Sequence, residues 1–447
     1  MPWVVPGGAP PPPGGAESDF DEPAGGGRRW WMVVVAIFGV MALVAGMVAF
    51  FTGGGDDDPT LAEDTSTTEP SDDSSGSSTT TTEPAAEPLP EEEFLALVDE
   101  LEAYVAEARG LEWQDDVSVE LANDEEFERR LFEDFEEDIE DLEETEVFYR
   151  ALGLLPSDMS LADQVRGIYS AGTLGVYFTE ENELVVRGTS PTPYVQQTIV
   201  HELVHAIDDQ NFELYRPEYQ DRKDEISAGF QATVEGNASR IEDQWLSDQP
   251  EEFRERAGDE EQSYSEGIDL DGFPQILLFQ IGAPYQLGEI FVDQLVADNG
   301  ERGVDAALRD PPDTSEQFLF PPLYLEGEPR VEVPPPPADG EIVDDGVIGA
   351  LFLYGLFTQT DSPVNQNDAV RAVQGWGGDW AVSWRDGDAS CMRADFVGDT
   401  DGDTDEIENT LETWTDSRGI GEVSTTDAGR VRLESCAASG GGSPPQV

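Results

Sequence analysis

The sequence predicts an α+β protein in which a small mixed sheet lies beside two helices that carry a metal site. Three observations lead to this fold. The two histidines of the 447-residue chain, His201 and His205, are four residues apart and so lie on one face of a helix. A strand-turn-strand pattern over 175–187 precedes this helix, and a second helix is predicted over 224–245. A smaller α+β lobe over 331–447 is expected to complete the chain.

Further helices and a strand are expected on either side of these elements. Acidic amphipathic helices are predicted over 91–109 and 124–152, with a short strand over 117–121 between them. Downstream, 273–296 predicts a mostly apolar helical stretch, and the proline-rich segment 311–340 predicts an extended loop or linker. We therefore expect 91–330 to form the domain that carries the metal site.

The first 90 residues are predicted to form no globular domain. Residues 1–27 are rich in proline and glycine and predict a disordered cytoplasmic tail. An uncharged apolar run over 30–51 predicts one transmembrane helix at 28–52. Arg28 and Arg29 precede this run, which predicts a cytoplasmic N-terminus and an extracellular position for the rest of the chain. A cleaved signal peptide is the alternative. Residues 53–90, rich in Ser, Thr, Asp and Glu, predict a disordered linker.

The histidines belong to the segment His201-Glu202-Leu-Val-His205, which has the HExxH pattern of zinc sites. In that pattern two neutral imidazoles bind Zn²⁺, a third protein ligand completes the shell, and a water takes the open position for the glutamate to deprotonate. An accidental pair of helical histidines is the alternative. A random pair would rarely fall four apart with glutamate beside the first. The sequence therefore predicts Zn²⁺ as cofactor and Glu202 as general base.

Glu235 is the predicted third ligand. Because the chain has no other histidine, and Cys391 and Cys436 are far along it, a nearby carboxylate must complete the shell. The helical neighbours of Glu235 are all small, which favours close approach to the first helix. They are Ala228, Ala232, Ala238 and Ser239, followed in sequence by Gly236. A glutamate at the edge of an alanine-based contact is the alternative. Glu225 and Glu242 are rival ligands.

These residues resemble those of the gluzincin class of zinc metallopeptidases, in particular a group of mostly uncharacterised bacterial predicted metallopeptidases. The resemblance covers about 95–398. The segments that carry it are His201-Glu-Leu-Val-His205-Ala206, Asp209-Gln210 with Phe212, and Glu235-Gly236-x-Ala238. Two later segments, 315–317 and 376–379, also resemble the group, but less specifically. The resemblance implies a zincin-like catalytic domain over 91–330, with a peptide or protein as substrate. It also implies an edge strand that binds the substrate by strand addition, for which 183–187 is the candidate.

Two features of the expected site remain open. In the wider class an aspartate one turn after the ligand glutamate orients a zinc-bound histidine, but Ser239 stands there, and Asn237 replaces the aspartate of the closer group. Asp208 or Asp209 then either supplies that acceptor or is solvated charge at a helix end. For the oxyanion, metallopeptidases commonly use a tyrosine or histidine. Tyr285 is the candidate, with burial as its alternative role. The other tyrosines considered are Tyr264 and Tyr354.

The composition restricts the partners. A formal net charge of −74, from 97 acidic and 23 basic residues, argues against nucleic acid and anionic membrane surfaces. Cys391 and Cys436 predict one disulfide, with two free thiols as the alternative. The expectation is a membrane-anchored extracellular zinc metallopeptidase. A catalytically silent binding module with structural zinc, and a zinc amidase acting on cell-wall material, remain as alternatives.

Overall fold

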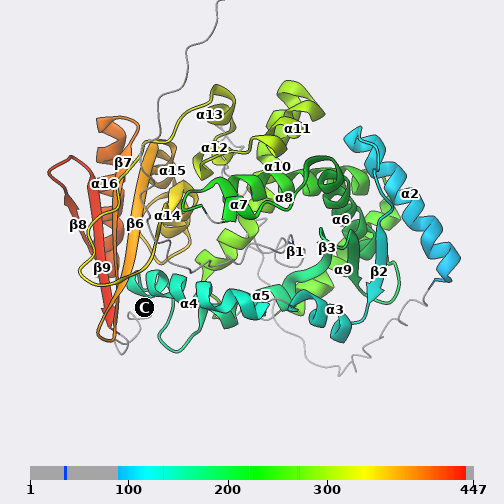
Figure 1. Ribbon diagram of the computed structural model, residues 1–447, viewed down its shortest axis with the longest axis horizontal. Helices are drawn as coiled ribbons and strands as arrows, with labels where there is room; N and C mark the ends of the chain where they lie inside the picture. The colour runs from blue at the N-terminus through cyan, green and yellow to red at the C-terminus, as the bar shows by residue number, and fades with distance from the viewer. Residues whose placement is uncertain are drawn as a thin grey trace, which may run out of the picture.

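The chain is α+β, with helices packed between two β-sheets. The structure, a computed structural model, describes residues 35–37, 89–133, 135–220, 222–268, 270 and 272–438. The two sheets lie toward opposite ends of the long axis, and the helices that carry the candidate site lie between them (Figure 1). Of the predicted elements, the first helix is confirmed as α2 (Glu91–Arg109), whereas the helix predicted over 124–152 is divided into two.

The helices that follow α2 are listed here once with their bounds. They are α3 (Asp124–Leu131), α4 (Phe135–Ala151), α5 (Leu161–Gly172), α6 (Pro193–Phe212), α7 (Pro217–Gln220), α8 (Ile226–Ser247), α9 (Glu251–Glu266), α10 (Gln275–Asn299), α11 (Glu301–Arg309), α12 (Ser315–Leu319), α13 (Pro321–Glu326), α14 (Gly349–Thr358), α15 (Gln366–Gln374) and α16 (Asp401–Arg418).

The smaller sheet is mixed and has the strand order β1-β3-β4-β2. Its strands are β1 (Val35–Ile37), β2 (Ser118–Ala122), β3 (Thr173–Phe178) and β4 (Glu183–Arg187). β3 and β4 form a hairpin whose turn includes Asn182 with φ of 51°, a left-handed conformation that asparagine tolerates. β2 pairs with β4 in parallel. The prediction that 183–187 is an edge strand is wrong, because β4 has a paired neighbour on both sides.

The predicted transmembrane helix over 28–52 is also wrong. Val35–Ile37 is instead the strand β1, which pairs antiparallel with β3. Within the described residues, no helix combines the length and the apolarity that crossing a bilayer requires. Apolar runs rich in valine and isoleucine suit strands as well as helices, so the pattern did not decide between them. The predicted single-pass topology, with a cytoplasmic N-terminus and an extracellular catalytic domain, depended on that helix and is wrong as well. The predicted tail 1–27 and most of the linker 53–90 lie outside the described residues.

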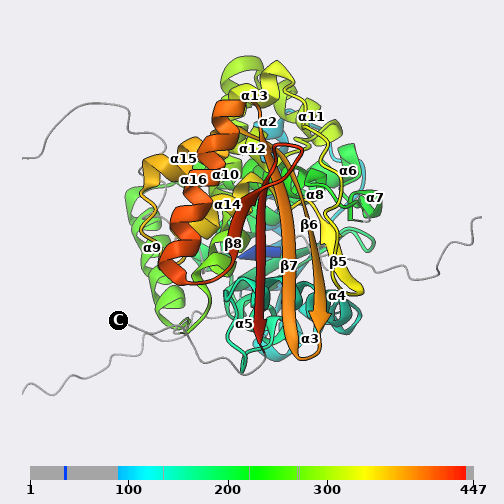
Figure 2. The ribbon, with the colours of Figure 1, turned by 90° about the vertical axis from the view of Figure 1, so that its left-hand side faces the viewer.

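The larger sheet is antiparallel, with the order β5-β6-β7-β9-β8. Its strands are β5 (Ile342–Gly346), β6 (Trp376–Asp386), β7 (Ala389–Gly398), β8 (Glu422–Thr425) and β9 (Val431–Ala438). Figure 2 looks onto this sheet, with α16 alongside it. Cys391 on β7 is directly opposite Cys436 on β9, and the two form the predicted disulfide. The main hydrophobic core draws residues from both sides of position 330, from Leu142 on α4 to Leu433 on β9.

Helices α6, α8 and α10 make the centre of the fold. α6 begins with Pro193 in its first turn and ends at Phe212, and the residue that caps it, Glu213, has a left-handed φ of 57°. α8 and α10 cross at Gly236 and Gly288, where a Cβ on Gly236 would lie 2.1 Å from the carbonyl carbon of Gly288. The small-residue stripe of α8 therefore serves two contacts. Gly236 brings α10 close, and Ala238 packs in the core cluster that contains the apolar face of α6.

A buried arginine ties three helices together beside this centre. Arg109, the last residue of α2, is 1% exposed. Its Nε donates to Asp208 Oδ1 on α6 at 2.7 Å, its Nη1 to Glu301 Oε2 at 2.9 Å, and its Nη2 to Asp305 Oδ1 at 3.1 Å on α11. These charge-assisted bonds raise the pKa of Arg109 against the opposing effect of burial.

Arg109→Ala is expected to lower the free energy of unfolding by about 3–5 kcal/mol, because it leaves the buried Asp208 carboxylate without its cation. Urea unfolding followed by circular dichroism measures this loss. Arg129→Ala is the matched control, since Arg129 pairs with Glu126 and Glu133 on an exposed surface and contributes about 0–1 kcal/mol. Equal losses in the two variants would contradict a structural role for the Arg109 network.

Candidate metal centre

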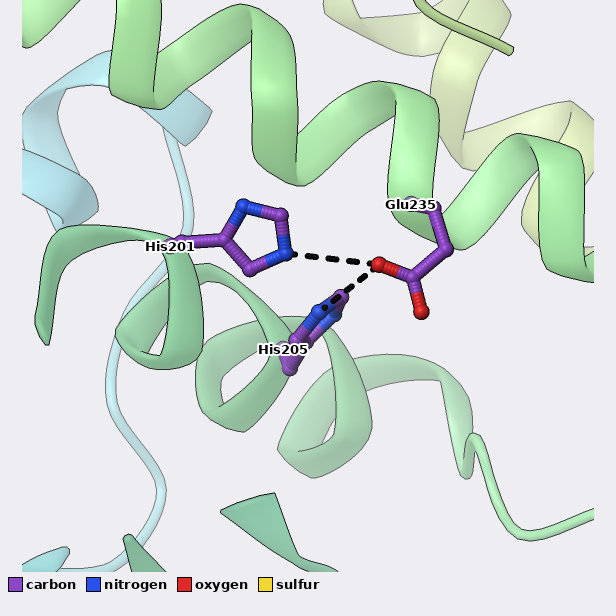
Figure 3. Close-up of side chains that lie close together, drawn as sticks. All are labelled: His201, His205 and Glu235. Atoms are coloured by element: carbon purple, nitrogen blue, oxygen red, sulfur yellow. Dashed lines mark hydrogen bonds and ion pairs between the residues drawn. The ribbon is translucent and has the colours of Figure 1, made fainter. Parts of the chain in front are cut away.

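The three predicted ligands meet at the contact of α6 with α8. His201 and His205 point from successive turns of α6 toward Glu235 on the neighbouring helix (Figure 3). Each of the three residues is at most 1% exposed. Each offers one ligand atom, and these atoms all lie within 4.8 Å of one another. The structure therefore brings Glu235 to two histidines that lie 30 and 34 positions before it in the sequence.

One oxygen of Glu235 faces both imidazoles. Glu235 Oε2 lies 3.3 Å from His201 Nε2 and 3.4 Å from His205 Nε2. In a tetrahedral zinc site with bonds of about 2.0–2.2 Å, neighbouring ligand atoms are roughly 3.3–3.6 Å apart. The observed separations are thus those between corners of such a tetrahedron, and they exceed the usual length of a hydrogen bond between nitrogen and oxygen.

Several buried polar atoms at this place have no hydrogen bond within the described chain. They are Nδ1 and Nε2 of His205, Oε1 of Glu235, and both carboxylate oxygens of Glu202. Leaving such atoms buried and unsatisfied costs about 1–3 kcal/mol each. A divalent cation and its water would satisfy the nitrogen and the carboxylates. The donor set of two imidazoles and one carboxylate is one that zinc accepts in catalytic sites, so the residues fit the metal.

Glu242 supports His201 from behind. Its Oε2 lies 2.9 Å from His201 Nδ1, and its Oε1 accepts a hydrogen bond from Gln197 Nε2. Burial raises the pKa of Glu242 well above its usual value, with Asp243 adding to the rise. Ligation through Nε2 of His201 requires the proton on Nδ1, and Glu242 is the acceptor placed to hold that proton. Glu242 was a rival ligand in the sequence analysis, but in the structure it contacts Nδ1 of His201 and is not among the three clustered ligand residues.

The other carboxylates considered lie away from the ligand atoms. Glu225 precedes α8, and its Oε2 accepts the Ser315 N–H at 3.1 Å. Asp208 accepts hydrogen bonds from Arg109 and from Asn237 Nδ2. Asp209 accepts from Leu214 N and from the Tyr177 hydroxyl. These hydrogen bonds of Asp208 and Asp209 join them to groups other than the histidines, and the histidine acceptor left open by the sequence is Glu242.

Glu202 is on α6, and its fully buried side chain lies against β3. A Cβ on Gly175 of β3 would come within 2.8 Å of Glu202 Oε1, so the strand passes directly over this carboxyl. Burial raises the pKa of Glu202 to about 7, although His205 and His201 oppose the rise. A carboxyl with a pKa near neutrality exchanges a proton readily at physiological pH.

Tyr285 is the tyrosine that reaches the centre. It lies on α10, is 5% exposed, and stacks on the ring of His201 with 6.1 Å between centroids and 27° between planes. Tyr264 instead accepts a hydrogen bond from Arg187 Nη1 at 3.1 Å. Tyr354 accepts one from Gln366 Nε2 and packs against Phe279. Of the three tyrosines considered, Tyr285 is the one in ring contact with a candidate ligand.

Tyr285 also lines a cavity of about 280 Å³. It lies between α4, α5, the first turns of α8 and the edge of the larger sheet. Residues that line it include Gln231 of α8, Ile281 of α10 and Asp345 of β5. Gln231 is one turn before Glu235 on α8, so the cavity lies beside the candidate centre, on the side of Tyr285.

Sequence reasoning missed two features of this site. It did not assign Glu242 as the partner of His201, although Glu242 follows Glu235 by two helical turns and so shares its face. It also assigned the substrate-side strand to β4, whereas the strand that crosses Glu202 is β3. The helical signal for Glu242 was present in the sequence. The position of β3 depends on strand order, which local pattern does not specify.

Comparisons with known proteins add no family. No protein-family model, no curated protein and no solved structure matches this chain.

Glu235→Ala is expected to abolish binding of the one zinc ion per chain that we predict, because it removes one of three protein ligands. Glu242→Gln should weaken zinc binding about 10–100-fold, since it weakens the acceptor behind His201 without removing a ligand. Elemental analysis after chelator dialysis and zinc titration measures both effects. Glu225→Gln serves as the buried-carboxylate control and should bind zinc like the parent; zinc loss in that variant would mean that the assignment of ligands is wrong.

Proposed function

We propose that the protein is a zinc-dependent hydrolase of peptide bonds, with His201, His205 and Glu235 as metal ligands and Glu202 as general base. The observation that carries the proposal is that one Glu235 oxygen lies at tetrahedral-edge distance from both histidine nitrogens, beside a buried, unsatisfied glutamate. When bound, zinc would supply a Lewis acid that polarises the carbonyl group and lowers the pKa of a water, so that the water loses a proton more readily and attacks the carbonyl carbon. The likeness of the HExxH and Glu-Gly-x-Ala segments to gluzincin metallopeptidases agrees with this reaction class.

The residues of the chain have distinct tasks in this proposal. Glu202 takes a proton from the attacking water and passes it to the leaving amine, which a pKa of about 7 permits in both directions. Glu242 holds the proton on His201 Nδ1 and so keeps Nε2 directed at the metal. Burial beneath β3 excludes bulk water from the Glu202 carboxyl, which strengthens the charge interactions there.

The presence of Glu202 beside the ligands favours an enzyme over a module with a purely structural zinc. A structural site is closed by protein ligands and has no use for a buried base beside the metal. The buried carboxyl of Glu202 has no hydrogen bond within the described chain, so it contributes an energetic cost to folding that a stabilising site would not retain. The same zinc chemistry would hydrolyse other amides, so the digest that tests the proposal includes a cell-wall amide.

Glu202→Gln is expected to lower turnover by about 10²–10⁴-fold while zinc remains bound, because the amide keeps the shape of the side chain but cannot take a proton. A broad peptide-library digest with mass-spectrometric readout measures turnover, and zinc content is measured on the same preparation. Hydrolysis by this variant at the parental rate would refute the role of Glu202. A zinc-loaded parent that cleaves no peptide and no cell-wall amide would leave a zinc-stabilised binding module as the account.

Tyr285→Phe is expected to lower kcat by about 10–10³-fold with little change in KM, if the hydroxyl stabilises the oxyanion only in the transition state. The phenyl ring keeps its stacking on His201, so zinc affinity should stay constant. Tyr264→Phe is the control, since that hydroxyl bonds to Arg187 away from the ligands. A loss of zinc affinity in Tyr285→Phe, or an unchanged kcat, would assign Tyr285 a packing role alone.

A further inference from the structure

Three carboxylates from separate segments meet where α12 and α13 approach the end of β7. Glu316 lies on α12, Glu328 follows α13, and Asp399 comes directly after β7. Each offers an oxygen, and these oxygens all lie within 4.8 Å of one another. Acidic side chains so close repel one another, and the cluster therefore needs a positive partner or bound protons.

The innermost carboxylate is buried and incompletely bonded. Glu316 is 4% exposed, and its Oε1 is buried without a hydrogen bond, whereas the carboxylate accepts the backbone N–H of Trp376. Oε2 of Glu328 is likewise buried and without a hydrogen bond. Two carboxylate oxygens of one cluster thus lack a donor within the described chain. A ligand with positive charge would give these two buried oxygens the partner that they lack.

No basic side chain among the described residues forms an ion pair with this cluster. Arg330, two residues after Glu328, instead forms an ion pair with Glu332. Burial, together with the negative charges of Asp399 and Glu328, raises the pKa of Glu316 to about 9. The pKa of Glu328 and of Asp399 is also raised, in each case by burial and then by a neighbouring acid. The neighbouring acids contribute to each rise, so the negative charges of the cluster favour a bound proton or a cation.

We propose that Glu316, Glu328 and Asp399 bind a divalent cation of the calcium type, at a second site distinct from the centre on α6 and α8. Carboxylate oxygens without imidazole or thiolate are the ligand set of hard cations. Two oxygens on opposite sides of a calcium ion, at bonds of about 2.3–2.6 Å, are roughly 4.6–5.2 Å apart, so the observed separations fit within its shell. Because Asp399 is exposed and Glu328 half-buried, water has access to the remaining coordination positions.

The position of the site suggests what the ion does. It joins α12 and the segment after α13 to the connection between β7 and α16, and thus links segments that are distant in the chain. α12 also contacts α8, which carries Glu235, and the Ser315 N–H donates to Glu225 at the start of α8. A cation at Glu316 therefore braces the segment that packs behind the candidate zinc helix, without contributing a group to the zinc centre.

The test uses the full chain, dialysed against chelator, with calcium as the probe. Melting temperature and Tb³⁺ luminescence, excited through tryptophan, are measured as calcium is added at constant ionic strength. The parent should gain a few degrees in melting temperature. Glu316→Gln and Asp399→Asn should each bind calcium at least tenfold more weakly. Glu326→Gln, which removes a nearby exposed charge from α13, and His201→Ala, which removes a zinc ligand, should keep the parental response.

Two results would overturn the proposal. One is a parent whose melting temperature and Tb³⁺ signal do not respond to millimolar calcium. The other is a calcium response that Glu326→Gln or His201→Ala reduces as much as Asp399→Asn does. If Glu316→Gln fails to fold, Asp399→Asn decides, because the exposed Asp399 tolerates a change to asparagine. A Glu316→Gln variant that melts higher than the parent, with no calcium effect in either, would show that the cluster holds protons instead.

Discussion

A buried carboxylate, Glu235, opposes two buried imidazoles at the contact between α6 and α8, and the centre of the fold is arranged around this contact. Charged and polar groups are buried at low cost only when partners meet them at the right distance. His201 receives one such partner in Glu242, and Glu235 is shared between both histidines. The pKa of Glu235 is lowered because the histidines outweigh the opposing effect of burial. A metal ion at their common focus would replace this mutual contact with coordination bonds.

The surrounding elements keep that contact dry and close. Gly236 and Gly288 bring α10 against α8, and this crossing carries Tyr285 to the ring of His201. On the opposite side Gly175 allows β3 to pass over Glu202. Arg109 holds the far end of α6 to α2 and α11 through Asp208. The site is therefore held by whole helices and a strand, which position side chains more firmly than loops do.

The sequence predicted the local parts of this arrangement well and the non-local parts poorly. His201, His205 and Glu235 come together as the helical spacing and the small residues around Glu235 indicated. The order of the four strands was missed, because β2 reaches β4 across some sixty residues and its pairing leaves no local pattern. The helix assigned to 28–52 failed because an apolar run does not distinguish a strand from a helix by itself. The role of Glu242 needed the real packing of α8 on α6, since the sequence offered Glu242 as a rival ligand and not as the partner of His201.

The most direct test of the central claim is diffraction from crystals grown with one equivalent of zinc, with data collected on both sides of the zinc absorption edge. The account predicts one anomalous peak at the contact of α6 and α8, about 2.0–2.2 Å from Nε2 of His201, Nε2 of His205 and an oxygen of Glu235, with Glu202 outside bonding distance. A peak elsewhere, a zinc ion bonded directly to Glu202, or no ordered zinc at this contact would contradict it.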